Sequence, residues 1–201
     1  MKDQYLTIER PSEGLYKEKG SKFLSFAYPT KNEENIKQHL ETLKKQYHDA
    51  RHHCFAWRLG PELSRYRAND DGEPSGSAGK PIYGQIVSRE LSDLLVVVVR
   101  YFGGTKLGVG GLINAYRSAA SDALDQNSII ERRVYDRLKV EFEYERMNAV
   151  MKVIKDLQLD FEEQEFDLNC SLTLKSWKRQ TERVFDSFSK IAACKISLIE
   201  E

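Results

Sequence analysis

The pattern of apolar and polar residues is most informative between residues 93 and 127. Leu94 to Val99 are apolar without interruption, which is typical of a strand covered on both faces. From Leu112 onward, apolar residues recur at spacings of three and four, so we predict that a helix begins there. Its inner face is rich in alanine, which allows close approach to a sheet. The first part of the chain should therefore be organised around one buried strand and the helix that follows it.

The segments before this strand contain both kinds of pattern. We predict two or three strands within residues 5–10 and 14–28, a helix over 33–47 capped by Asn32, and strands over 51–59 and 64–68. Alternation along 51–59 places His53, Phe55, Trp57 and Leu59 on one face and His52, Cys54, Ala56 and Arg58 on the other. Another helix should begin near Pro81. Its inward-facing residues are expected to be Ile82, Tyr83, Ile86 and Val87.

The rest of the chain has a regular pattern after residue 137. Residues 129–137 show neither a strong period nor a breaker, and we interpret them as a short basic connection between domains. We then predict a strand over 138–144, a helix over 149–157, a hairpin over 160–175, a helix over 177–191 and a strand over 195–199. This βαββαβ order is that of a ferredoxin-like unit. We therefore predict an α+β protein with domains over residues 1–131 and 136–201, the second being a binding or docking domain.

Composition narrows the classes of function that remain. Lys and Arg number 31 and so do Asp and Glu, so no overall field attracts nucleic acid and only a local basic patch is permitted. The three cysteines are scattered, which favours reduced thiols. The N-terminus has no apolar signal segment and no stretch is long enough to span a bilayer. We expect a cytoplasmic protein without a membrane partner.

Five glycines lie within the nine residues from Gly103 to Gly111, between the predicted strand and helix. Glycine lets backbone N–H groups converge and a helix N-terminus adds positive potential, so we expect an anion such as phosphate there. The spacing is neither that of a P-loop nor that of the dinucleotide-binding motif, and a tight connection that binds nothing is the alternative. The candidate phosphate- or nucleic-acid-binding residues are Lys80, Arg100, Gly103, Gly104, Lys106, Gly108, Gly110, Gly111 and Arg117.

A second unusual loop, residues 69–81, is long and polar and precedes another predicted helix start. Its carboxylates are of the type that binds Mg²⁺ beside a phosphate. The alternative, which we favour, is that they cap backbone amides or pair with Lys80 and Arg100. The candidate residues of this supporting loop are Asp70, Asp71, Glu73, Ser75 and Ser77.

His52, His53 and Cys54 are consecutive in a predicted strand and raise the question of a metal site. Adjacent strand residues point to opposite faces, so only His52 and Cys54 are able to share an ion, and two ligands do not make a zinc site. Packed or hydrogen-bonded histidines are the alternative. We expect neither a metal nor a cofactor.

Two motifs resemble the signature of the IMPACT/YigZ family. They are Asp70-Asp71-Gly72-Glu73-Pro74 with Gly76–Pro81, and Val99–Gly108 with Gly110-Gly111-Leu112. The resemblance covers the whole chain, because bacterial members carry a small ferredoxin-like domain after the signature domain. It implies that the N-terminal domain has the fold of the second domain of a small-subunit ribosomal protein. Eukaryotic members act in translational control, partly through an additional N-terminal domain that this sequence does not contain.

Three functions are compatible with these observations. We favour a non-catalytic protein that binds RNA or the surface of a ribosome or translation factor. Arg58, Arg65 and Arg67 would add phosphate contacts, and Tyr66, Tyr101 and Tyr116 would stack on bases. The second function is an enzyme acting on a phosphorylated small molecule, for which His52 and Cys54 are the nearest candidates for a nucleophile and base. The third is a protein-interaction module whose loops are purely structural.

Overall fold

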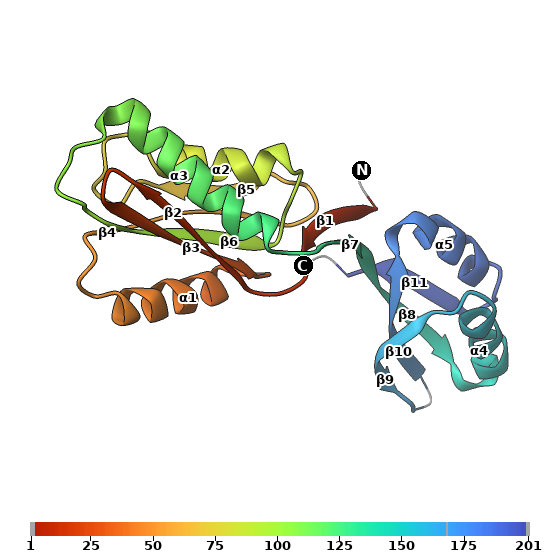
Figure 1. The fold of residues 1–201 in the computed structure, drawn as a ribbon. Helices are drawn as coiled ribbons and strands as arrows, with labels where there is room; N and C mark the ends of the chain where they lie inside the picture. The colour runs from red at the N-terminus through yellow and green to blue at the C-terminus, as the bar shows by residue number, and fades with distance from the viewer. Residues whose placement is uncertain (1–2, 168, 200–201) are drawn as a thin grey trace. The chain divides into compact units, whose positions relative to one another are not determined.

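Strand β6 (Leu94–Tyr101) lies at the centre of the N-terminal part of the molecule. The computed structural model describes residues 3–167 and 169–199, and the chain divides into two units, one ending at Arg132 and the other beginning at Arg133. In the first unit, β6 is the middle strand of an antiparallel sheet of order β2-β3-β6-β4-β5 (Figure 1). The other strands are β2 (Ser12–Glu18), β3 (Ser21–Pro29), β4 (His52–Leu59) and β5 (Arg65–Asn69).

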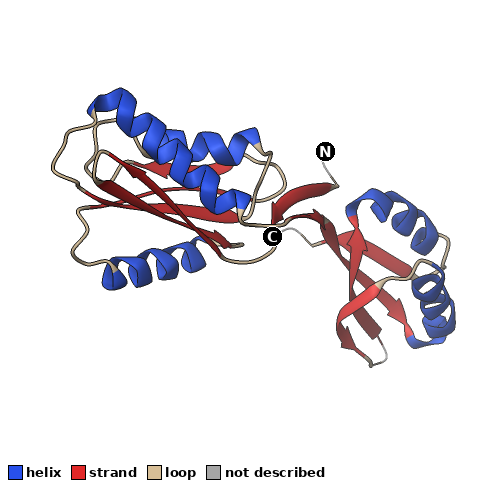
Figure 2. Ribbon diagram, viewed as in Figure 1, coloured by secondary structure: helices blue, strands red, loops and turns tan. Residues whose placement is uncertain are grey.

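Helices cover both faces of this sheet (Figure 2). Helix α1 (Glu33–Gln46) packs on the face that carries Trp57, Leu95 and Val97. Helices α2 (Gly79–Ser88) and α3 (Gly108–Asp125) pack on the face that carries Cys54 and Val96. Because successive β6 residues face opposite sides, burial on both sides explains the uninterrupted apolar run. The predicted division of β4 into two faces is confirmed.

Local sequence signals account for the start of α1 but not for that of α3, and they misplace one side chain of α2. Asn32 caps α1 as predicted, its side-chain oxygen accepting the N–H of Asn35 at 2.8 Å. Helix α3 begins at Gly108, four residues before the predicted start, although its first three residues are exposed and glycine has a low helix propensity. On α2, the prediction for Val87 is wrong: this side chain is 42% exposed, because Ile82 and Ile86 already form the packed face.

Residues 129–137 are not the irregular connection that their sequence predicts. Strand β7 (Ile129–Arg133) pairs with β1 (Gln4–Ile8) in a two-stranded sheet, and a new strand begins at Tyr135. The amide of Glu9 extends the pairing by donating to the carbonyl of Ser128 at 3.0 Å. The partner is more than a hundred residues away, so no local pattern reveals it.

The second unit has the predicted ferredoxin-like order. Its elements are β8 (Tyr135–Glu143), η1 (Tyr144–Arg146), α4 (Met147–Asp156), β9 (Asp160–Glu165), β10 (Asn169–Trp177), η2 (Lys178–Gln180), α5 (Thr181–Ser189) and β11 (Cys194–Leu198). The strands form an antiparallel sheet of order β11-β8-β10-β9, and both α-helices pack on the face that carries Leu138 and Leu172. Helix α5 begins at Thr181 rather than at Trp177, because β10 continues through Trp177. No helix in the described residues is long and apolar enough to cross a membrane.

Candidate phosphate-binding site

The glycine-rich segment is divided between a loop and a helix. Residues 102–107 form the exposed loop, whereas Gly108, Gly110 and Gly111 belong to the first turn of α3. Gly103 permits a close approach, because a Cβ there would lie 1.9 Å from the carbonyl carbon of Gly20 in the β2–β3 turn. Gly104 has a φ of +88°, in the left-handed region. These glycines therefore shape the loop itself.

The N-terminus of α3 has the features expected of an anion-binding site. Among the described contacts, no side chain caps it, and its first turn contains no acidic residue. Lys106 is exposed immediately before it. The N–H groups of a first helical turn have no partner within the helix, so this end carries positive potential.

The N-terminus of α2 is different because Asp70 occupies it. One carboxylate oxygen of Asp70 accepts the N–H groups of Ala78 at 3.0 Å and Gly79 at 2.8 Å, and the other accepts the N–H of Gly76 at 2.8 Å. Burial alone would raise the pKa of Asp70, but these three hydrogen bonds lower it. Asp70 thus serves as the cap for this helix, and an external anion has no access to the same amides.

Arg100 has an internal partner, the carboxylate of Glu73. Its Nη1 donates to Glu73 Oε1 at 2.6 Å, and the two side chains are only 8% and 4% exposed. The strand register explains this burial, since Arg100 lies between Phe23 of β3 and His52 of β4. The loop that carries Glu73 lies between β5 and α2, and we call it the acidic loop because it also contains Asp70 and Asp71. Arg100 therefore holds the loop in place, and the structure does not bring it to the surface beside Lys106.

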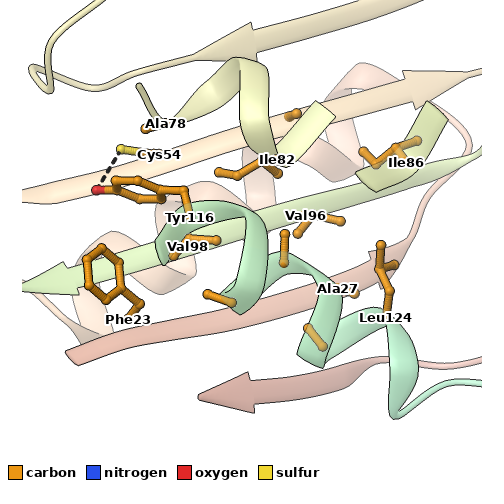
Figure 3. Packing of buried hydrophobic residues seen from close by; sticks show 14 of the residues in the cluster. Phe23, Ala27, Cys54, Ala78, Ile82, Ile86, Val96, Val98, Tyr116 and Leu124 are labelled. Atoms are coloured by element: carbon orange, nitrogen blue, oxygen red, sulfur yellow. Dashed lines mark hydrogen bonds between the residues drawn. The ribbon is translucent and has the colours of Figure 1, made fainter. Parts of the chain in front are cut away.

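Glu73 and Tyr116 extend this contact into a buried polar network. Tyr116 donates to the same oxygen of Glu73 at 2.7 Å, and the Cys54 thiol lies 3.3 Å from the Tyr116 hydroxyl (Figure 3). Burial raises the pKa of the Cys54 thiol to about 12, so the thiol stays protonated near neutral pH. Burial likewise raises the pKa of Tyr116. The network ties β4, β6 and α3 to the acidic loop.

The histidines have internal contacts too. His52 Nδ1 lies 2.8 Å from the carbonyl oxygen of Asp71, and the N–H of His53 donates to the Asp71 carboxylate at 2.6 Å. Burial lowers the pKa of His53, which favours its neutral form. Within the described residues, no three His, Cys, Asp or Glu side chains are grouped closely enough to hold a metal ion.

The predicted base-stacking tyrosines do not come together. Tyr116 is fully buried, and Tyr101 packs on the α1 side of the sheet, where its hydroxyl donates to Asp49 at 2.7 Å. Tyr66 is 56% exposed and stacks on Tyr83 with ring centroids 4.5 Å apart. The three rings are separated because they lie on three different elements, β5, β6 and α3.

The additional arginines are also dispersed. Arg65 pairs with Glu33 of α1 at 3.1 Å, and Arg58 donates to the carbonyl of Leu63 at 3.2 Å. Arg67 lines a groove on the α1 side together with Phe55 and Trp57. None of these contacts brings the three arginines to the glycine-rich loop.

Lys80 and Arg117 are the two predicted cations that the structure does bring together. They line a groove of 530 Å³ between α2 and α3, and neither side chain has a described acidic partner. The lining residues are Gly76, Lys80, Pro81, Gly84, Gln85, Ile113 and Arg117. Gly84, Gln85 and Ile113 were not predicted, although Lys80 with Gly84 and Ile113 with Arg117 have the four-residue spacing of a shared helix face. The groove contains two positive charges and no carboxylate.

Comparison with known proteins shows which family this arrangement belongs to. Residues 19–124 match the Impact N-terminal domain family, over a range that includes both loops, the buried network and the groove. The chain belongs to the IMPACT family. It is 32% identical to the IMPACT family member YvyE of Bacillus subtilis over 169 residues, covering 84% of this chain and 78% of the relative. It is also 36% identical to the IMPACT family member YigZ of Escherichia coli over 134 residues, 66% of each chain.

The chain is also similar to a yeast protein and to a solved structure. The Protein IMPACT homolog of Saccharomyces cerevisiae is 32% identical over 96 residues, which cover 45% of this chain and 36% of the yeast protein. A solved structure described as a hypothetical protein matches the whole length of both chains, with a TM-score of 0.79 and 25% identity. The sequence similarity to the yeast protein thus covers part of each chain, whereas the structural similarity to the solved structure covers the whole of the present chain.

Proposed function

We propose that this IMPACT family member is a non-catalytic binding protein whose N-terminal unit binds the phosphate groups of RNA in the groove between α2 and α3. The observation that carries the proposal is the pair Lys80 and Arg117, which share a groove free of carboxylates. Because the net charge of the chain is zero, a polyanion would be attracted by a local cluster of cations such as this pair. The exposed Lys106 and the uncapped start of α3 would extend the same contact.

The acidic loop supports this site indirectly. Asp70 fixes the first turn of α2, on which Lys80 lies, and Glu73 fixes Tyr116, which precedes Arg117 on α3. Both cations are therefore mounted on rigid elements whose spacing the buried network maintains. The family resemblance suggests an association with translation. On that basis we propose ribosomal or messenger RNA as the polyanion that the groove binds.

An enzymatic function is less well supported by the same contacts. The Cys54 thiol is held protonated, and the carboxylates of Asp70 and Glu73 are engaged with backbone amides, Arg100 and Tyr116. A nucleophile would require a lowered pKa or an adjacent base, and Cys54 has neither. These polar side chains thus stabilise the structure, and the α2–α3 groove is the candidate site for binding.

Substitution of the two groove cations tests the proposal. The affinity of Lys80→Ala/Arg117→Ala for a structured RNA should fall at least tenfold at 50 mM salt, at about 1 kcal/mol or more for each lost charged contact. Lys45→Ala, an exposed lysine on α1 across the sheet, is the matched control and should bind as the wild type does. Equal losses in the double variant and the control, or wild-type affinity in both, would contradict the proposal.

A further inference from the structure

The second unit carries an aromatic pair on the sheet face that its helices do not cover. Tyr135 of β8 and Trp177 of β10 are directly opposite each other in the register of the two central strands. Leu138 and Leu174 face the helices and are fully buried. Tyr135 and Trp177 each lie three residues from one of these leucines, so strand alternation places them on the opposite face. Tyr135 is 40% exposed.

Three cations are held over these two rings. The guanidinium carbons of Arg133 and Arg179 lie 4.6 Å and 5.7 Å from the centroid of the Trp177 ring. The Lys175 ammonium lies 4.6 Å from the centroid of Tyr135, and in the sheet Lys175 is also opposite Asp160 of β9. Residues 133–201 contain 12 basic and 14 acidic residues, so this positively charged cluster lies in a unit whose net charge is slightly negative.

We propose that this cluster, residues 133, 135, 175, 177 and 179, is a binding site for single-stranded RNA. Flat rings on the two central strands of a four-stranded sheet are the arrangement on which unpaired bases stack, and adjacent Arg and Lys side chains neutralise the phosphates between them. Guanidinium planes add stacking surfaces of their own. An acidic peptide would engage the cations but would make no use of the exposed Tyr135 ring, so nucleic acid fits the cluster better. The site does not depend on the α2–α3 groove, since every residue lies in the second unit.

Tryptophan fluorescence tests this directly, because the chain has two tryptophans and only Trp177 belongs to the cluster. In Trp57→Phe, the remaining emission comes from Trp177. A single-stranded octamer of uridine should quench the Trp177 emission saturably. The quenching should be the same in a variant that also carries Lys80→Ala and Arg117→Ala, because this site is separate from the α2–α3 groove. A duplex RNA of the same length should quench it less. Absence of quenching by the single strand would overturn the proposal.

A pair of tyrosine variants supplies the control for ring stacking. Tyr135→Ala should weaken binding of the uridine octamer about tenfold, since stacking on one aromatic side chain typically contributes that much or more. Tyr135→Phe should retain binding, and Tyr144→Ala, which removes a 64% exposed tyrosine elsewhere in the same unit, should leave it unchanged. Equal effects of Tyr135→Ala and Tyr144→Ala would overturn the assignment. A second result would also overturn it. If a polyglutamate peptide displaced the octamer and bound Tyr135→Ala with the same affinity as the wild type, the site would recognise acidic protein.

Discussion

At the scale of single residues, the family motifs act chiefly inside the protein. Arg100 and Glu73 form a buried ion pair, and Tyr116 and His52 complete the surroundings of the carboxylate. The sequence showed that Arg100 ends a buried strand and that a carboxylate loop was a possible partner. It did not show that the loop covers Arg100, because that depends on the register of β6 with both β3 and β4.

The buried pair predicts a large loss of stability when one partner is removed. Arg100→Ala should lower the free energy of unfolding by about 3–5 kcal/mol, because Glu73 is left buried without a counter-charge. Arg117→Ala, an exposed arginine nearby, should change it by less than about 0.5 kcal/mol. Urea unfolding followed by fluorescence measures both. A loss below 1 kcal/mol in Arg100→Ala would mean that water or another group replaces the pair.

The Cys54 thiol predicts a particular dependence of stability on pH. Its pKa rises from 9.0 to about 12 on folding, so the unfolded chain releases this proton at lower pH than the folded one. The contribution of the thiol is fully present below pH 9 and is lost as the pH rises from about 9 toward 12. Cys54→Ala should flatten this part of the stability curve. Identical curves for wild type and Cys54→Ala above pH 9 would show that the thiol ionises equally in both states.

At the scale of elements, the glycines of residues 103–111 have two different structural roles, which the sequence alone does not distinguish. Gly103 is needed for contact with the β2–β3 turn, whereas a Cβ at Gly110 would meet nothing within 4 Å. Both have the same appearance in the sequence. Periodicity predicted β6, α1 with its Asn32 cap and the whole ferredoxin-like order, because those signals are local. The pairing of β7 with β1 escaped prediction because it joins distant segments of the chain. The start of α3 escaped prediction because its glycines add no apolar period and have a low helix propensity.

The two glycines predict opposite results for the same substitution. Gly103→Ala should destabilise the protein by about 1–3 kcal/mol, since the added methyl group overlaps the backbone of Gly20. Gly110→Ala should stabilise it by about 0.5–1 kcal/mol, because alanine favours the helix and has space there. Thermal or urea unfolding of both variants is the measurement. Destabilisation by Gly110→Ala would indicate that the α3 start is not helical in solution.

At the scale of the whole molecule, the division of contacts supports a proposal of two domains that fold independently, as the sequence predicts for residues 1–131 and 136–201. The first unit has a hydrophobic cluster on each face of its sheet, and the second unit has a core of its own. Each unit has one tryptophan, Trp57 in the first and Trp177 in the second. Phe188 is fully buried in the second core. The tryptophans therefore report on the two domains separately.

A core substitution in the second domain should affect only that domain. Phe188→Ala should lower its stability by about 3–5 kcal/mol. In Trp57→Phe, the unfolding midpoint reported by Trp177 should then shift to lower urea. In Trp177→Phe, the midpoint reported by Trp57 should not move. A common shift of both reporters would mean that the two domains unfold as one cooperative unit.

The central claim is that the groove between α2 and α3 binds phosphate groups, and the salt dependence of RNA affinity tests it most directly. Each phosphate contact contributes a slope of about 0.7–0.9 in a plot of log affinity against log salt concentration. Arg117→Ala should flatten the wild-type slope by about that amount, whereas Arg117→Lys, which retains the charge, should keep most of it. A slope in Arg117→Ala equal to that of the wild type would contradict the account, because Arg117 would then contact no phosphate.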